Sequence, residues 1–366
     1  MRKLVSKIAL AAAGVLVALV LTEAALTLFW PITPMPSFKG LMERDPELGQ
    51  KFIPGARKVV VGTFNDFRVP IHINAHGFRF PEPPMERGPD VCRIALFGDS
   101  EVFGTGVQDG ETLDRAMERC LNASSGRVCQ VLNFAIPGTG PTVSGKVLQR
   151  YALEWTPDVV IVLVTAVNDL GDEYRYAHRA TGTVAAASAA PRSLRKRLAC
   201  LNVVTLLKYK VGPRLPAWIG RRLPGSRTPS QYIDEWYVSG HRDESVELMT
   251  RALEGIRATC ASRGIRMVLA VLPARGQYDP WFEDMLRRTT AARILAEFLA
   301  DPERPQRILG AWAEQAGVPF VPVLDPFRAR VREGVSLKYP NDGHLNARGT
   351  LELANLLARA VLESRP

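Results

Sequence analysis

Hydrophobic and polar positions divide the chain into three kinds of segment. Residues 8–30 form an apolar run of 23 with a single charge, Glu23. From residue 93 onward, short apolar runs alternate with segments in which apolar residues recur with helical spacing. Between these parts, residues 31–90 are rich in proline and glycine and hold short β-like pieces at 58–61 and 69–73. The pattern predicts an N-terminal helix, a small β region and an α/β domain.

The short apolar runs predict a parallel sheet covered by helices on both faces. They are rich in Val, Ile, Leu or Phe and lie at residues 93–97, 128–134, 159–165, 266–272 and 320–323. Helices are expected around residues 246–260 and from 346 towards 363, where an apolar stripe repeats every three or four positions. Five parallel strands between helices predict a flavodoxin-like, three-layer α/β/α fold.

The first apolar run is long enough to cross a membrane. At ~1.5 Å per residue, a helix of this length spans a hydrocarbon core of ~30 Å. Arg2, Lys3 and Lys7 precede it, so the positive-inside rule keeps the terminus cytoplasmic and sends the rest of the chain across. A cleaved signal peptide is the alternative, but its apolar core is only ~7–15 residues long. We expect an uncleaved, single-pass anchor in the inner membrane with the remaining domain in the periplasm.

The net charge of +10 is concentrated in one stretch. Between residues 171 and 230 the chain carries twelve Lys or Arg and two acidic residues, so this stretch alone accounts for +10. The organisation we expect is an anchor at 1–30, a stalk and small β region at 31–90, and an α/β domain at 91–366 with a basic insertion at 171–240. The insertion follows the third strand, so it is expected to overhang the ligand-binding edge of the sheet. It suits an anionic lipid or polysaccharide, or a solvated face; nucleic acid is not expected.

The cysteines and histidines do not suggest a metal site. The five cysteines contain no Cys-x-x-Cys pair, and His72 and His76 have no third ligand nearby, so neither metal nor cofactor is expected. In an exported protein, Cys129 is expected to form a disulfide with either Cys120 or Cys92. The odd count leaves at least one thiol free or bonded to another chain.

Short groups of polar residues or glycine follow three predicted strands and precede the last helix. These groups are Gly98-Asp99-Ser100, Pro137-Gly138, Asn168-Asp169 and Asn341-Asp342-Gly343-His344. A serine hydroxyl becomes a strong nucleophile when a neighbouring imidazole accepts its proton. A carboxylate on the other ring nitrogen fixes the tautomer of that imidazole, and backbone or amide N–H groups stabilise the oxyanion that forms. The groups therefore contain every part that acyl transfer through a serine requires.

In order and context, these groups resemble the motif blocks of the SGNH (GDSL) hydrolase superfamily. The resemblance covers residues 93–362 apart from the insertion, and it implies the flavodoxin-like fold without metal or cofactor. It implies Ser100 as the nucleophile, His344 as the general base and Asp342 as the orienting acid. The oxyanion hole would comprise the backbone N–H groups of Ser100 and Gly138 and the side-chain amide of Asn168.

Two positions depart from the family pattern. Ala166 stands where the third block has a glycine, which places a methyl group near the site. The last block reads Asp-x-His, where Asp-x-x-His is commoner, and Asn341 occupies the place three residues before the histidine. Asp342 is expected to orient His344, rather than Asn341 or Asp169, because only an ionised carboxylate stabilises imidazolium and Asp169 belongs to the third strand's end.

The resemblance implies a serine esterase that works through an acyl-serine intermediate. The anchor and the basic insertion point to an O-acetyl or other short acyl ester on a cell-envelope glycan or lipid. The same intermediate also permits acyl transfer to an envelope polysaccharide. A third interpretation is a non-catalytic envelope binding module, against which the complete set of five site residues argues. The oligomeric state is left open by the sequence.

Overall fold

The centre of the protein is a five-stranded parallel sheet. The structure is a computed structural model that describes residues 2–124, 126–179, 202–207 and 233–363. The strands are β5 (Val91–Phe97), β6 (Val128–Asn133), β7 (Val159–Thr165), β8 (Arg266–Leu272) and β9 (Phe320–Val321). They lie in the order β6-β5-β7-β8-β9, with every neighbouring pair parallel. This is the flavodoxin-like 2-1-3-4-5 order, so the predicted fold class is confirmed.

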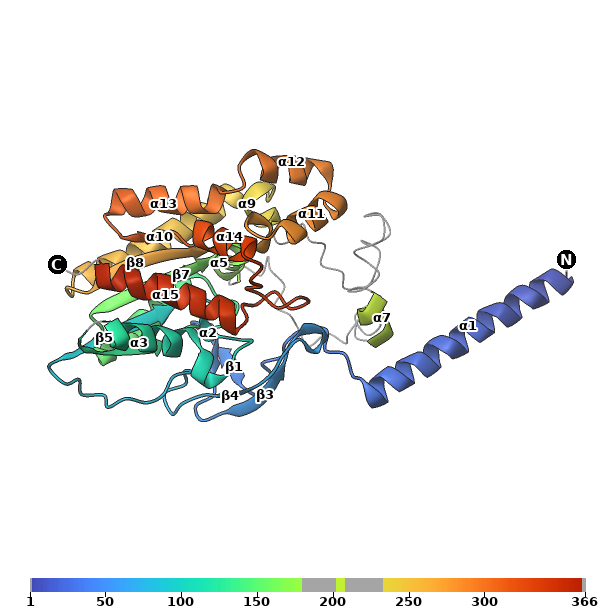
Figure 1. Ribbon diagram of the computed structural model, residues 1–366, viewed down its shortest axis with the longest axis horizontal. Helices are drawn as coiled ribbons and strands as arrows, with labels where there is room; N and C mark the ends of the chain where they lie inside the picture. Colours follow the sequence, from blue (N-terminus) through green and yellow to red (C-terminus); the bar gives the residue numbers. More distant parts are fainter. Residues whose placement is uncertain (1, 125, 180–201, 208–232, 364–366) are drawn as a thin grey trace.

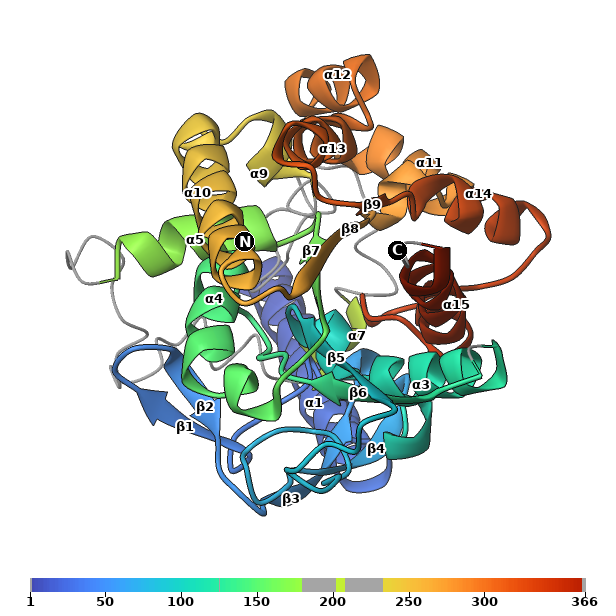
Figure 2. The same ribbon diagram turned by 90° about the vertical axis from the view of Figure 1, so that its left-hand side faces the viewer.

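Helices cover both faces of the sheet and complete three layers (Figure 2). One face carries α3 (Leu113–Ser124) and α15 (Ala347–Glu363), and the other carries α4 (Pro141–Arg150), α10 (Arg242–Ala261) and α13 (Arg304–Ala316). The side chains of β5 alternate between the two cores: Ile94 and Leu96 belong to the first and Ala95 and Phe97 to the second. The sheet is therefore buried on both sides, as its continuous apolar runs require.

The remaining helices and turns lie around this core. They are α2 (Ser100–Phe103), α5 (Asp169–Ala177), α7 (Asn202–Leu206), α9 (Asp234–Tyr237), α11 (Pro280–Thr289), α12 (Ala292–Ala300), α14 (Leu324–Arg332) and the short turns η1 (Thr63–Asn65), η2 (Asp109–Glu111), η3 (Ala152–Trp155) and η7 (Arg275–Gln277). The third and fourth strands match their predicted bounds. The fifth ends two residues early, because Val323 already has helical backbone angles as the N-cap of α14.

Residues 31–90, which were predicted to form a stalk and small β region, pack onto the α/β domain. Their strands form two antiparallel hairpins, β1 (Met42–Asp45) with β2 (Gly49–Phe52) and β3 (Arg57–Val61) with β4 (Arg68–His72). Buried Phe52, Val60 and Ile71 belong to the same apolar core as α3 and α15. The two β-like pieces seen in the sequence are therefore the two strands of one hairpin that is built into the domain.

The helix α1 (Arg2–Phe29) projects away from the domain (Figure 1). Its segment Val5–Phe29 has 25 residues with a mean hydropathy of 2.2, and none of its most apolar window is buried. Among the described residues it is the one helix that is long and apolar enough to cross a membrane, and a signal sequence has the same properties.

The expected disulfides are not formed in the structure. Cys92, Cys120 and Cys260 are free thiols. The Cys120 Sγ instead donates to Asn355 Oδ1 of α15 at 3.0 Å. Cys92 and Cys129 stand opposite each other on β5 and β6 as thiols. The hydrogen bond with Cys129 and burial both raise the pKa of the Cys92 thiol.

The basic insertion falls mostly outside the described residues. Of residues 171–240, the structure describes 171–179, 202–207 and 233–240. Ten of its twelve basic residues lie in the part that is not described. The prediction that the insertion overhangs the sheet edge concerns this part and lies outside the described residues.

Candidate active site

Ser100 stands at the carboxyl end of the first parallel strand. β5 ends at Phe97 and Ser100 begins α2, so the chain turns sharply at Gly98. A Cβ atom on Gly98 would lie 2.5 Å from Val102 Cγ2 and 3.0 Å from the Leu163 carbonyl oxygen, so the turn requires glycine. β5 lies between β6 and β7, where the strand order reverses, which is where open α/β sheets bind their ligands.

His344 reaches Ser100 from the loop before α15. Its Nε2 lies 2.9 Å from Ser100 Oγ, and its Nδ1 is hydrogen-bonded to Asp342 Oδ1. A neutral imidazole that donates from Nδ1 carries a lone pair on Nε2, so it can accept the serine proton. The Asp342 side chain is buried, whereas 21% of the His344 side chain is exposed. The structure thus brings Ser100, His344 and Asp342 together in the order that a nucleophile, a base and an orienting acid require.

Electrostatics favour the charged forms of both partners in the His344–Asp342 pair. Burial alone would lower the pKa of His344, but the hydrogen bond and negative charge of Asp342 outweigh it and raise this pKa. Burial alone would raise the pKa of Asp342. The hydrogen bond to His344, the charge of His344 and the hydrogen bond from the Thr63 N–H outweigh burial and lower this pKa. The ionised carboxylate is therefore favoured, and it is the form that can stabilise an imidazolium at His344.

The two other candidates for the orienting residue have different partners. Asn341 Nδ2 donates to Asp66 Oδ1 at 2.7 Å. Asp169 accepts from the Thr165 N–H at 2.8 Å, at the end of the third strand. Of the three candidates, Asp342 alone contacts the His344 ring.

Two backbone N–H groups near the strand ends have no partner among the described residues. Among the described residues, neither the Ser100 nor the Gly138 N–H donates to a protein acceptor. Gly138 follows β6 with φ of 70°, a conformation that favours glycine. Gln50 of β2 holds this loop, since its Nε2 donates to the Pro137 carbonyl at 2.6 Å. Both N–H groups are available to an oxyanion at this edge of the sheet.

The Asn168 amide is bound by a cluster of acids. Its Nδ2 lies 3.0 Å from Asp99 Oδ2, 3.2 Å from Asp169 Oδ1 and 2.8 Å from Asp172 Oδ2. An amide has two hydrogens, so both point at carboxylates in this structure. Asn168 must therefore release one acid before it can donate to an oxyanion.

Burial raises the pKa of two of the acids that bind Asn168, Asp99 and Asp169. Burial, followed by the charge of Glu101, raises the pKa of Asp99. Burial and then the charges of Asp99 and Asp172 raise the pKa of Asp169 well above its usual range. The Asn168 amide partly offsets the repulsion, because its hydrogen bond favours the charged form of Asp99.

Sequence reasoning missed a buried ion pair that holds the His344 loop. Lys338 Nζ lies 2.7 Å from Glu101 Oε1 and donates to the Gly343 carbonyl at 2.7 Å. Glu101 Oε2 accepts from the Leu345 N–H at 2.9 Å. Both charged side chains are buried. The residue next to the nucleophile in the sequence thus holds the chain on both sides of His344, and its position beside Ser100 was the one available signal.

A second missed contact comes from the turn between β3 and β4. The Thr63 N–H donates to Asp342 Oδ2 at 2.8 Å. Asp66 Oδ2 accepts from the backbone N–H groups of Asn341 and Asp342 at 2.6 and 2.7 Å. Because the partners are more than 270 residues apart, no local pattern in the sequence indicates this contact.

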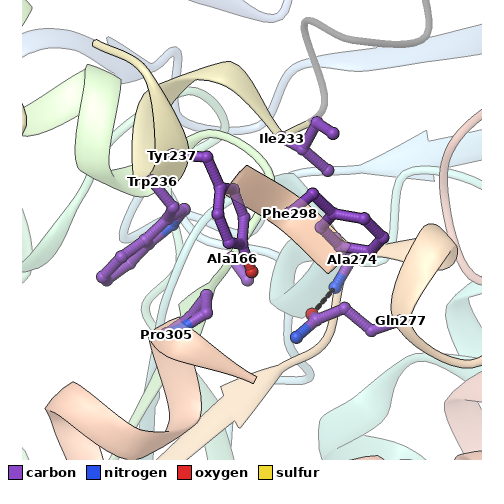
Figure 3. A pocket seen from close by; sticks show the side chains of 8 residues that line it. All are labelled: Ala166, Ile233, Trp236, Tyr237, Ala274, Gln277, Phe298 and Pro305. Carbon is purple, nitrogen blue, oxygen red and sulfur yellow. Dashed lines mark hydrogen bonds between the residues drawn. The ribbon is translucent and has the colours of Figure 1, made fainter. Parts of the chain in front are cut away.

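The Ala166 methyl packs into an apolar pocket (Figure 3). The lining residues come from the ends of β7 and β8 and from nearby helices: Ala166, Ile233, Trp236, Tyr237, Ala274, Gln277, Phe298 and Pro305. Gln277 Oε1 accepts from the Ala274 N–H at 2.7 Å and closes one side. None of Ser100, Asp342 and His344 lines this pocket, so the departure from the family's glycine adds packing beside β7.

The histidine pair considered in the sequence does not come together around a shared site. His72 Nδ1 binds Asp109 Oδ2 at 2.5 Å, whereas His76 packs edge-on against Trp155. Within the described part of the chain, no group of three or more His, Cys, Asp or Glu side chains is arranged to hold a metal ion.

Several solved structures that are similar to this chain are described as esterases or lipases. Axe2, an acetylxylan esterase from Geobacillus stearothermophilus, is 12% identical with a TM-score of 0.41, covering 74% of this chain and 93% of its own. The acetyl xylan esterase AlAXEase is 14% identical with a TM-score of 0.42, covering 74% and 99%. A putative GDSL-like lipase from Parabacteroides merdae is 15% identical with a TM-score of 0.40, covering 76% and 98%. No family model and no curated protein matches the chain.

Proposed function

We propose that this protein is a membrane-anchored serine esterase of the SGNH type, acting on an acyl ester of the cell envelope. The observation that carries the proposal is the contact of His344 Nε2 with Ser100 Oγ at 2.9 Å, with Asp342 on the other ring nitrogen. Three side chains, from the start of α2 and from the loop before α15, converge in a geometry that makes a serine hydroxyl nucleophilic.

In the first half-reaction, Ser100 Oγ attacks the ester carbonyl while His344 Nε2 takes the hydroxyl proton. The carbonyl oxygen becomes an oxyanion, and the N–H groups of Ser100 and Gly138 donate to it. Asn168 adds a third donor once its amide leaves one of its acids. The tetrahedral intermediate then collapses, the C–O bond of the ester breaks, and imidazolium returns the proton to the departing alcohol. The product is an acyl-Ser100 ester.

In the second half-reaction, water attacks the acyl carbon while His344 again takes a proton. The same donors hold the oxyanion, and the carboxylic acid leaves when the Ser100–acyl bond breaks and Oγ recovers its proton. Asp342 stays ionised throughout and stabilises the imidazolium in both steps. The acyl groups that we propose the site removes are short ones such as acetyl.

The anchored topology has its own support. The apolar segment of α1 is longer than the core of a signal peptide. Residues directly after it are built into the domain: Asn65 binds the Pro31 carbonyl at 2.7 Å and Asn202 Oδ1 accepts from the Ile32 N–H at 2.5 Å. An uncleaved α1 with a cytoplasmic start places the catalytic domain outside the inner membrane. A phosphatase fused to the carboxyl end should then be active, and an inactive fusion would contradict this topology.

A fluorophosphonate probe tests the chemistry directly. The purified full-length protein should be labelled and should hydrolyse 4-nitrophenyl acetate, and Ser100→Ala should lose both properties. Ser262→Ala is the matched control, because Ser262 lies at the exposed end of α10 and its hydroxyl donates to the nearby Thr259 carbonyl. Absence of labelling in the folded parent protein would reject the esterase and favour a non-catalytic binding module.

A further inference from the structure

The segment that leaves the membrane helix is bound to a single turn of the domain. The Thr33 carbonyl accepts from the Phe64 N–H at 2.7 Å. Asn65 Oδ1 accepts from the Thr33 N–H at 3.2 Å, and its Nδ2 binds the Pro31 carbonyl. Phe64 and Asn65 have φ of 57° and 61°, so this turn adopts a left-handed backbone to make these contacts.

The same turn holds the catalytic acid on its other side. The Thr63 N–H binds Asp342 Oδ2, and Asp66 accepts the backbone N–H groups of Asn341 and Asp342. Phe67, which follows the turn, packs its ring 5.0 Å from that of Tyr339 in the same loop. The exit from the membrane helix and the catalytic loop are therefore separated by the width of one turn.

The anchor is also tied to the domain by the end of α1 itself. Glu23 accepts hydrogen bonds from the N–H groups of Asn202 and Val203 at 3.0 and 2.8 Å, and Asn202 in turn accepts from the Ile32 N–H. α7 thus bridges α1 and the exit segment. The catalytic domain has fixed contacts with its anchor on two sides and is not carried on a loose tether.

These contacts set the height of the active site above the bilayer. Three residues, Pro31 to Thr33, connect Trp30, the residue after the end of α1, to the turn, and three residues cover at most ~11 Å. The headgroup layer of one leaflet is roughly 6 Å deep, from the difference between the whole bilayer and its hydrocarbon core. The turn that holds Asp342 is therefore kept close to the headgroups. Figure 1 shows the β3–β4 hairpin and the loop before α15 on the side of the domain from which α1 leaves.

Large apolar side chains are exposed at this edge of the domain. Trp30 and Met35 of the exit segment are 66% and 57% exposed, and Trp281 at the start of α11 is 59% exposed. Trp281 belongs to the same edge as the catalytic loop, since Arg275 lies over its ring at 5.5 Å and also binds the Tyr339 carbonyl. Exposed tryptophans are the side chains most typical of a membrane–water interface.

We propose that the site takes its ester from the membrane itself: the substrate is an acyl ester carried by a lipid of the adjacent leaflet, presented at headgroup level. This proposal rests on the esterase function and the anchored topology proposed above, and it names the substrate class. A site held beside the headgroups meets lipid-borne esters at the high local concentration of the bilayer. An ester on a polymer that extends away from the membrane is out of its reach.

The test compares two acetate esters of the same phenol, one water-soluble and one with a hexadecyl chain held in phosphatidylethanolamine–phosphatidylglycerol vesicles. The full-length protein is reconstituted in the same vesicles, with and without a ten-residue helical spacer between Trp30 and Pro31. The spacer raises the domain by ~15 Å but keeps the contacts of residues 31–33 with the turn. The vesicle-held ester should be hydrolysed at least ~10-fold more slowly with the spacer, and the soluble ester at the parent rate.

Two further variants separate height from side effects. Asn202→Ala removes the side-chain bonds of Asn202 to Glu23 and Ile32, which are part of the contacts that the spacer disrupts, without raising the domain; it should keep the rate on both esters. Trp281→Gln should slow hydrolysis of the vesicle-held ester alone. An unchanged rate on the vesicle-held ester with the spacer, or faster hydrolysis of a soluble acetylated oligosaccharide than of the lipid ester, overturns the proposal while the esterase function stands. If the parent protein neither hydrolyses an ester nor is labelled at Ser100, the lipid-ester proposal and the esterase function are both rejected.

Discussion

Replacing Asp342 by asparagine exchanges one carboxylate oxygen for an NH₂ group and tests the hydrogen bonds around His344. The buried Thr63 N–H donates to Asp342 Oδ2, so the asparagine must keep its carbonyl oxygen on that side. Leaving this donor unpaired costs about 1–3 kcal/mol. The new NH₂ group then faces His344 Nδ1, which has to accept from it. The ring is forced into the tautomer with its proton on Nε2, where it can no longer take the proton of Ser100.

The size of the effect follows from that tautomer. In serine triads of other enzymes, the same exchange of acid for amide costs about 10⁴ in turnover. That loss corresponds to about 5.5 kcal/mol of transition-state stabilisation, at ~1.36 kcal/mol per factor of ten. The defect of Asp342→Asn should therefore approach that of Ser100→Ala. Asn341→Ala, whose parent amide binds Asp66 and not His344, should cost far less.

The assay is turnover of 4-nitrophenyl acetate by full-length protein, with circular dichroism and thermal unfolding to show that each variant is folded. Fluorophosphonate labelling should be slowed in Asp342→Asn, since the nucleophile is no longer activated. A folded Asp342→Asn protein with turnover within ten-fold of the parent would refute the reasoning. The enzyme would then work with a Ser100–His344 dyad or with a carboxylate from elsewhere.

Three other predictions follow from the same contacts. kcat/KM should rise with pH through a value above 6.5, because the base must be neutral and Asp342 raises the pKa of His344; in Asp342→Asn this acidic limb should move to lower pH. Lys338→Met should lower the free energy of unfolding by about 3–5 kcal/mol in urea titration, since Glu101 stays buried without its cation, and adding Glu101→Gln should restore part of it. Asp66→Asn should lower kcat roughly 10- to 100-fold with little change in KM, because the loop that carries the acid loosens; an unchanged kcat would contradict its positioning role.

Local pattern in the sequence was sufficient for the fold and for the main site candidates. The strands are continuous apolar runs, because a sheet that is buried on both faces needs apolar side chains at successive positions. Ser100, Gly138 and Asn168 follow directly after three of these strands, and parallel strands deliver their carboxyl ends to one edge. Short-range order in the chain therefore determined which residues gather at that edge.

Contacts between distant segments were decided only by the tertiary structure. The sequence presents Asn341 and Asp342 side by side, and it is the turn at Thr63 and Asp66 that aims the first away from His344 and holds the second against it. The same turn joins the catalytic loop to the membrane exit at Thr33. Such contacts depend on how a hairpin packs against a loop more than 270 residues later.

The partners of buried polar groups were likewise beyond the reach of the sequence. The Glu101–Lys338 pair, the bond between Asp99 and the Asn168 amide, and the bond between Cys120 and Asn355 each join residues on different elements. A buried donor, acceptor or charge must find a partner, but which partner it finds is set by the position of its element in the packed core. Periodicity in the chain specifies which face of an element is buried, and only the assembled layers specify what that face meets.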